Sequence, residues 1–166
     1  MALREIRLFG DPVLTSRADE VVEFDANLAR LAEDMLETMD DSDGVGLAAN
    51  QVGVLQRIFV YDCEGVRGAL VNPVWEPVGD EMQLGEEGCL SVPGIGGEVE
   101  RHMRVRATGQ DPQGRPVAIE AEGLLARCIQ HETDHLDGVM FMKRMSPEVR
   151  KAAMRDLRAT DWFMKG

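Results

Sequence analysis

Long hydrophobic runs, a cysteine framework and an excess of positive charge are all missing from this 166-residue sequence. No stretch approaches the roughly 20 apolar residues that a membrane-spanning helix needs. Arg4, Glu5 and Arg7 lie where a signal peptide would need an unbroken apolar segment. The three cysteines, Cys63, Cys89 and Cys128, are odd in number and widely spaced, so no disulfide framework is expected. Lys and Arg number 18 against 30 Asp and Glu, a net charge of −12, so we do not expect a general DNA-binding or RNA-binding protein. These absences predict a reduced cytoplasmic protein without a membrane segment.

Repeats, low-complexity tracts and linkers are also missing. The composition, 44% hydrophobic and 29% charged, is that of an ordinary globular protein, and the length is sufficient for a buried core. We therefore expect residues 1–166 to form one domain.

The hydrophobic spacing predicts a first helix over residues 25–40, with Asp25 as its N-cap. Its buried face would comprise Leu28, Leu31, Ala32, Met35, Leu36 and Met39. Its solvated face would comprise Arg30, Glu33, Asp34 and Glu37.

Short strands punctuated by Gly, Pro and Asn-Pro follow the first helix. They are predicted at 57–62, 69–72, 82–86 and 98–108, with residues 111–116 as a turn between two strands. Helical periodicity returns over 122–137, and Gly138 is placed to end that helix. A last helix is predicted over 146–162, with Pro147 at its first position. Strands in the middle and helices at both ends predict an α+β fold with small mixed or antiparallel sheets.

The segment Gln130-His-Glu-Thr-Asp-His135 carries the strongest chemical signal. His131 and His135 lie one helical turn apart on the same face, so both imidazoles can reach one metal ion. Glu132 is placed to act on a water molecule at that metal without being a ligand. Two polar residues on an exposed helix are the ordinary alternative, but the spacing and the intervening Glu favour a metal site.

A third ligand has to come from elsewhere in the chain. Cys89 lies between Gly88 and a turn that ends a strand, and a thiolate is a good metal ligand. Taken alone, Cys89 would be interpreted as a small buried hydrophobic residue, and a carboxylate such as Glu148 is a rival ligand. Cys63 and Cys128 lie in apolar runs and are expected to be buried.

The Gly-rich segment 44–53 is the third unusual feature. A helix rather than a strand precedes it, which makes a dinucleotide-binding loop a weak interpretation. Gln51 could donate a hydrogen bond to a developing oxyanion, although a surface loop is the simpler interpretation of the composition.

Together these segments resemble the three signature motifs of the peptide deformylases. The motifs are Gly44-Val-Gly-Leu-Ala-Ala-Asn-Gln51, Glu87-Gly-Cys-Leu-Ser91 and Gln130-His-Glu-Thr-Asp-His135, in the order of the family. The resemblance extends from Gly10-Asp11-Pro12 to the last helix. Asn50 is a mild departure, because many members carry Pro or Thr there.

The resemblance implies a mechanism and a site. Cys89, His131 and His135 would hold one divalent metal, Fe²⁺ in cells, with Zn²⁺, Ni²⁺ or Co²⁺ able to replace it. Glu132 would be the general base, and Gln51 with the backbone N–H of Leu90 would stabilise the oxyanion. Gly46 would hydrogen-bond the substrate backbone, and the reaction would release formate from N-formylmethionyl nascent peptides. The fold would place its sheets around the metal-binding helix.

A methionine pocket is also indicated by spacing on the predicted helix. Leu124 and Cys128 share a face with the two histidines, which places an apolar surface beside the metal. Packing of both residues into the core is the alternative. Val45 and Leu90 are further candidates for the pocket wall.

Two residues of the strand predicted at 98–108 need comment. His102 has the parity of Glu98 and Glu100, so we expect it to face solvent and to have no role. Arg101 has the opposite parity and is expected to pair with an acid, either Asp43 or Glu87.

The acidity of the chain is unevenly distributed. Residues 143–166 contain seven Lys and Arg against three Asp and Glu, so the terminal helix is basic. An amphipathic, solvated helix explains this, but in related deformylases the C-terminal helix is thought to dock near the ribosomal exit tunnel, which suggests a weak ribosome contact. Nothing demands an oligomer, so a monomer is expected.

Three rival functions remain open from the sequence. A metallopeptidase with the His-Glu-x-x-His motif would not need Cys89, and a metal-stabilised binding protein would not need Glu132. A degenerate deformylase with an altered substrate is opposed by the intact ligands and general-base position.

Overall fold

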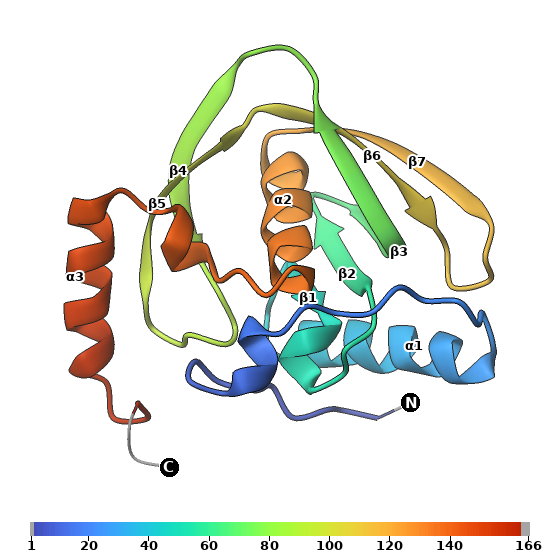
Figure 1. The fold of residues 1–166 in the computed structure, drawn as a ribbon, viewed down its shortest axis with the longest axis horizontal. Coiled ribbons are helices and arrows are strands. Elements are labelled where there is room, and N and C mark those ends of the chain that lie inside the picture. Colours follow the sequence, from blue (N-terminus) through green and yellow to red (C-terminus); the bar gives the residue numbers. More distant parts are fainter. Residues whose placement is uncertain (1, 164–166) are drawn as a thin grey trace.

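Two antiparallel sheets surround one helix in the computed structural model, which describes residues 2–163 (Figure 1). The larger sheet contains β1 (Gly46–Ala48), β2 (Ile58–Cys63), β3 (Val66–Pro77), β6 (Arg104–Gln110) and β7 (Pro116–Glu122), hydrogen-bonded in that order. The smaller sheet pairs β4 (Met82–Gly88) with β5 (Gly96–His102). The helices are α1 (Ala26–Asp41), α2 (Leu124–Leu136) and α3 (Pro147–Arg158), and short 3-10 turns occur at Pro12–Thr15, Ala49–Val52 and Phe141–Arg144. The predicted α+β fold is confirmed.

Strand β2 shows why the larger sheet is so apolar at its centre. Phe59 and Tyr61 face the cluster that packs against α2, whereas Ile58 and Val60 face the cluster that packs against α1. Alternate side chains of a strand point to opposite faces, so residues 58–61, which are buried on both sides, are all apolar.

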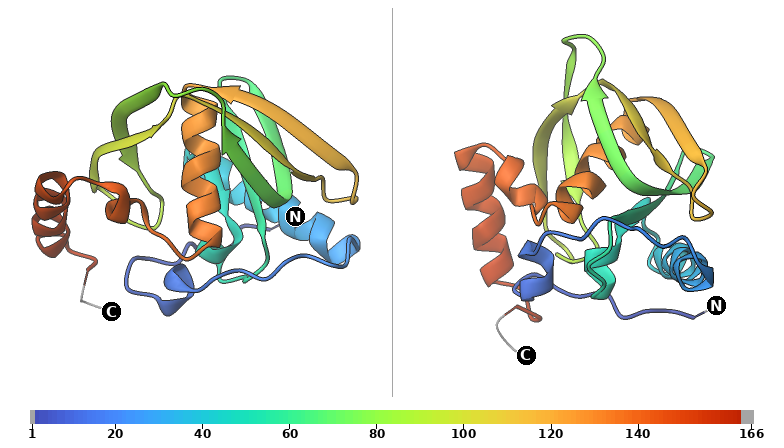
Figure 2. Two further views of the ribbon diagram at one scale, coloured as in Figure 1. Left: turned by 45° about the horizontal axis from the view of Figure 1, so that its top comes forward. Right: turned by 45° about the vertical axis from the view of Figure 1, so that its right-hand side comes forward.

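Helix α2 is the central element. Figure 2 shows it between the β4–β5 hairpin and the five-stranded sheet, and eleven of its 13 residues are buried. Gly123 precedes it with φ +63°, a conformation that residues other than Gly rarely adopt. The sharp turn from β7 into α2 therefore depends on this glycine.

The first helix follows the prediction except on one face. Asp25 caps it by accepting a hydrogen bond from Leu28 N. Asp34, which we expected to be solvated, is 4% exposed, because residues 2–4 cross this face. Its carboxylate accepts hydrogen bonds from Ala2 N (2.8 Å) and Arg4 Nε (3.1 Å).

The continuous strand expected over 98–108 is wrong. The chain turns at Met103 and passes from β5 in one sheet to β6 in the other. Gln130 of α2 holds this corner, since its side chain accepts from His102 N (2.9 Å) and donates to His102 O (3.0 Å). The His102 ring is half-buried 5.6 Å from the Trp75 ring rather than facing solvent.

Two further predictions need correction. The Gly-rich segment 44–53 is not a surface loop, because it contains the short strand β1 followed by the buried 3-10 turn Ala49–Val52. The last helix ends at Arg158 instead of residue 162, because the chain turns there and the Trp162 indole N–H donates to Pro93 O (3.1 Å). None of the described helices is long and apolar enough to cross a membrane.

Replacing Asp34 by Asn should lower the free energy of unfolding by about 1–3 kcal/mol, because the Arg4 ion pair and a buried backbone hydrogen bond are weakened. Burial raises the pKa of Asp34, but the hydrogen bonds from Ala2 and Arg4 outweigh it and hold the pKa below its usual value. A lowered carboxyl pKa stabilises the fold above the unfolded-state pKa, and the benefit is lost as the pH falls. Urea unfolding should therefore separate wild type from D34N at pH 7, and the difference should shrink progressively as the pH falls below about 4.

Glu33→Gln is the matched control, because Glu33 is exposed on the same helix. An equal loss of stability in E33Q and D34N would contradict the assignment.

Candidate metal centre

Three side chains from two parts of the chain converge beside α2. His131 and His135 lie one turn apart on the helix, and Cys89 lies directly after β4. Their ligand atoms are all within 4.8 Å of one another, and Cys89 Sγ is 3.3 Å from His135 Nε2. The rival ligand Glu148 is exposed at the start of α3 and is not part of this cluster.

The donor set fits a transition-metal ion. One thiolate and two imidazoles form a three-ligand site of the kind that leaves a coordination position open for catalysis. Burial holds the pKa of His135 well below its usual value, which favours the neutral imidazole that binds metal. The sequence therefore identified all three members of a group that the structure brings together.

Glu87 orients His131, a role that was not predicted from the sequence. Its Oε1 lies 2.8 Å from His131 Nδ1, which leaves Nε2 of that ring for the metal. Burial raises the pKa of Glu87, but hydrogen bonds from Arg101 and His131 lower it to about 2, so the carboxylate stays ionised. The position of Glu87 two residues before Cys89 was the available signal.

Arg101 pairs with Glu87, one of the two partners expected, and not with Asp43. Its Nε and Nη2 donate to the two oxygens of Glu87 at 2.8 and 2.9 Å, and its Nη1 donates to Asp134 at 2.8 Å. A buried arginine shared between two acids satisfies its donors with charge-assisted hydrogen bonds.

Glu132 lies at the edge of the metal group. Its Oε2 is 4.0 Å from His131 Nε2, and its Oε1 is buried without a hydrogen-bond partner among residues 2–163. Burial raises the pKa of Glu132 to about 7. A carboxyl group with this pKa can both accept and release a proton near neutral pH.

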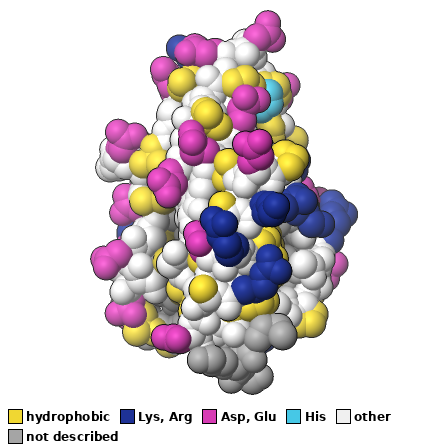
Figure 3. All heavy atoms as spheres, turned by 90° about the vertical axis from the view of Figure 1, so that its left-hand side faces the viewer, with side chains coloured by type: hydrophobic (Ala, Val, Ile, Leu, Met, Phe, Trp, Pro, Cys, Tyr) yellow, Lys and Arg dark blue, Asp and Glu magenta, His cyan; other side chains and the backbone are white. Residues whose placement is uncertain are grey.

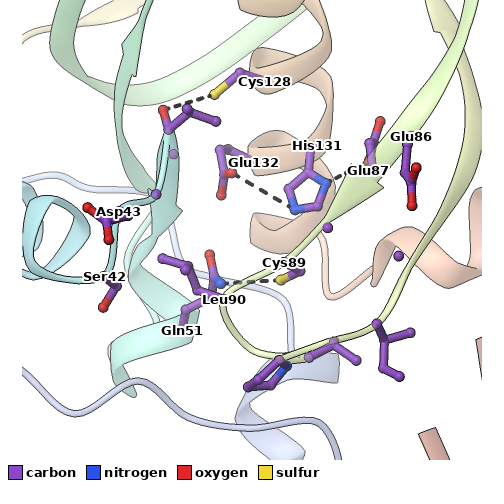
Figure 4. A pocket seen from close by; sticks show the side chains of 18 of the residues that line it. Ser42, Asp43, Gln51, Glu86, Glu87, Cys89, Leu90, Cys128, His131 and Glu132 are labelled. Carbon is purple, nitrogen blue, oxygen red and sulfur yellow. Dashed lines mark hydrogen bonds and ion pairs between the residues drawn. The ribbon is translucent and has the colours of Figure 1, made fainter. Parts of the chain in front are cut away.

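Gln51 is buried rather than part of a surface loop. Its Oε1 accepts from Ala48 N (2.9 Å), so its amide nitrogen points toward Ser91 Oγ (3.1 Å) and Cys89 Sγ (3.5 Å). Leu90 follows Cys89 directly, and its side chain packs against the α1 cluster. Both residues therefore lie beside the thiol, as Figure 4 shows.

A cavity of about 660 Å³ opens in front of this group. The residues predicted to bind substrate, which are Val45, Gly46, Leu124 and Cys128, all line this cavity. Gln51, Cys89, Leu90, His131 and Glu132 line it as well. Val45 and Leu124 are 47% and 39% exposed and lie at its rim, whereas Cys128 is buried in the wall. Cys63 is also buried, as expected, and its Sγ approaches Val45 O at 3.6 Å.

Gly46 leaves room for the site. A Cβ at this position would lie 2.6 Å from Glu132 Oε2 and 2.8 Å from Cys128 Sγ. Strand β1 is also the edge of the five-stranded sheet, so its second side is open to an added strand.

Comparison with known proteins decides between the rival functions. The family model for polypeptide deformylase matches residues 3–151. The chain belongs to the polypeptide deformylase family. Peptide deformylase 1 of Corynebacterium efficiens is 62% identical over 169 residues, which cover 99% of this chain and 100% of that protein.

Solved deformylase structures share the fold. Peptide deformylase from Thermus thermophilus superposes with a TM-score of 0.88 at 45% identity, covering 95% of this chain and 94% of that one. The enzyme from Synechococcus elongatus, in complex with actinonin, gives 0.87 at 39% identity, covering 92% of this chain and 86% of that one.

This deformylase is therefore a metal-dependent hydrolase that removes the N-formyl group from nascent peptides. The metallopeptidase and the non-catalytic binding protein are not favoured.

Gly46→Ala should reduce turnover about 100-fold while bound metal is retained, because the new methyl group displaces the Glu132 carboxylate. Gly44→Ala should lose less turnover, because its Cβ would lie 2.8 Å from the flexible end of the Leu90 side chain. Formate release and metal content measured on both variants test this order. Full turnover in G46A would show that the position of Glu132 does not depend on this glycine.

Proposed function

We propose that Cys89, His131 and His135 hold the catalytic divalent metal of this deformylase, and that the ion is Fe²⁺ in cells. The convergence of their ligand atoms within 4.8 Å, from two separate motifs, carries the proposal. Zn²⁺, Ni²⁺ and Co²⁺ accept the same donors and could replace iron. Residues 1–166 would act as one catalytic domain in the cytoplasm, where nascent chains emerge, and as a monomer.

When bound, the metal would supply Lewis-acid polarisation of the formyl group and acidify the attacking water. Glu132, whose Oε2 lies 4.0 Å from His131 Nε2, takes the proton of that water and later delivers it to the departing amine. The burial that raises its pKa to about 7 suits both steps. Glu87 keeps His131 oriented throughout by receiving its Nδ1–H.

Gln51 and Leu90 stabilise the negative charge that develops on the formyl oxygen. The Gln51 amide is oriented by Ala48 N, so its nitrogen already faces the thiol side of the cavity. It would exchange its long 3.5 Å contact with Cys89 Sγ for a hydrogen bond to the oxyanion, and the backbone N–H of Leu90 would add a second donor.

The substrate would lie along β1 as an added strand, with Gly46 hydrogen-bonded to its backbone. Its methionine side chain would enter the apolar part of the cavity between Val45, Leu124 and Cys128. A flexible thioether fills an irregular apolar pocket well.

The basic face of the molecule would contact ribosomal RNA. Figure 3 shows Lys and Arg side chains gathered over the region of α3. The exposed members are Lys143, Arg144, Arg150, Lys151, Arg155 and Arg158. Such a contact between a short basic surface and phosphates is weak and sensitive to salt.

Glu132→Gln should keep the metal and lose deformylation by about 10²–10⁴-fold, because the amide cannot accept the proton. Formate release from a formyl-Met peptide by the anaerobically Fe²⁺-loaded protein measures this. Glu120→Gln, an exposed substitution on β7, is the control and should match wild type. Absence of formate from metal-loaded wild type would overturn the function, and full turnover in E132Q would overturn the role of Glu132.

The triple variant K143Q/K151Q/R155Q should pellet less with ribosomes than wild type at low salt. A control with the same change in net charge, R17Q/R30Q/R106Q, removes cations elsewhere and should pellet like wild type. Equal losses in the two variants would indicate nonspecific attraction and contradict the proposed contact through α3.

A further inference from the structure

Arg127 is a buried arginine beside the metal centre that the mechanism above does not use. It lies on α2 one turn before His131 and is 7% exposed. Its Nη1 donates to Glu87 Oε2 at 2.6 Å and to Val99 O at 3.0 Å. A charged side chain is costly to bury, so these contacts need a reason.

The hydrogen bonds of Glu87 show what Arg127 adds. Oε1 of Glu87 receives His131 Nδ1 and Arg101 Nη2, while Oε2 receives Arg101 Nε and Arg127 Nη1. Arg127 and His131 are four residues apart, so they reach the two oxygens from successive turns of one helix face. The carboxylate is thereby fixed along the axis of the same helix that carries the ligand.

Arg101 alone does not fix the Glu87 carboxylate along the axis of α2. Its Nη1 is bound to Asp134, which Arg144 also contacts at 3.0 Å, so Arg101 is shared between two acids. It also approaches Glu87 from β5 rather than from α2. Arg127 is therefore the one of these two guanidinium groups that reaches Glu87 from the helix of His131 itself.

Gly85 makes the position of Arg127 possible. A Cβ at residue 85 would lie 3.0 Å from Arg127 Nη2, tighter than ordinary van der Waals contact. Nη2 is buried and has no hydrogen-bond partner among the described residues, so the guanidinium is held in place by Nη1 and by packing over this glycine. A Cβ at residue 85 would require Nη2 to shift by a few tenths of an ångström, and a branched side chain there would require a larger shift of the guanidinium.

We propose that Arg127 is a positioning residue for the metal ligand His131, acting through Glu87, and that Gly85 is required for it. Arg127 holds Glu87 where its other oxygen receives the Nδ1–H of His131, which fixes the tautomer and the ring orientation. The proposal rests on the proposed role of His131 as a ligand.

The test uses Co²⁺ as the probe metal on the full-length protein. Arg127→Met keeps the aliphatic stem and removes the guanidinium, and we expect Co²⁺ release to a chelator to become about 10-fold faster or more. The Co²⁺ absorption spectrum should change, and kcat should fall while KM stays within about twofold of wild type. Arg127→Lys, which can still reach Glu87, should restore part of the lost metal retention.

Gly85→Val provides an independent route, because it keeps the arginine and displaces it. It should accelerate Co²⁺ release in the same direction, and it keeps the proposal testable where R127M does not fold. Arg104→Met is the control, since the ion pairs that Arg104 forms within residues 2–163, with Glu81 and Glu122, are exposed. Its Co²⁺ release should equal that of wild type.

Unchanged Co²⁺ release and spectrum in R127M, with a lower melting temperature of the metal-free protein, would overturn the proposal. Arg127 would then only join β4 and β5 to α2. A raised KM with unchanged Co²⁺ release would also overturn the proposal. It would indicate that Arg127 acts as part of the wall of the substrate cavity. Failure of the proposed function looks different, because in that case Cys89→Ala would retain Co²⁺ as tightly as wild type.

Discussion

Burial of helix α2 between two sheets is the constraint on which the rest of the structure depends. Eleven of its 13 residues are buried, and seven of these are polar or charged. Buried polar groups need hydrogen-bond partners, so the surrounding elements have to supply them. Glu87 of β4 and Arg101 of β5 meet this need for His131 and Asp134, while Gln130 holds the corner at His102.

The separation of the two sheets follows from the same arrangement. Because the chain leaves β5 at Met103 and enters the larger sheet, the β4–β5 hairpin is free to lie along the other side of α2. That placement brings Cys89 beside the two histidines. Replacing buried ion pairs by apolar residues is often neutral or stabilising in proteins, so the ions buried beside α2 are better explained by the site than by stability.

Local patterns were sufficient for part of this fold and for the two histidines of the metal group. The four-residue spacing of His131 and His135 places them on one helix face whatever surrounds the helix, and the apolar stripe of α1 predicts its buried side. Cys89 was more difficult from the residues alone, because a thiol between Gly and Leu also fits a core position. Its place in the site came from the resemblance of three ordered motifs to one family.

The predictions that were wrong share one cause, which is contacts between segments far apart in the sequence. Asp34 is buried only because residues 2–4 cross it, and a helix pattern contains no information about that crossing. The period-2 pattern of 98–108 continues through a corner that Gln130 holds from another element. Likewise the contacts of Glu87 with His131 and Arg127 span about 40 residues of sequence.

The central claim is that one thiolate and two imidazoles, from two separate motifs, bind a single metal. X-ray absorption at the metal edge of the Co²⁺-loaded protein tests it most directly, because the spectrum distinguishes sulfur from nitrogen ligands. The account predicts one sulfur and two imidazole nitrogens in wild type, with the sulfur contribution lost in Cys89→Ser. A wild-type spectrum without sulfur, or one unchanged by that substitution, would contradict it.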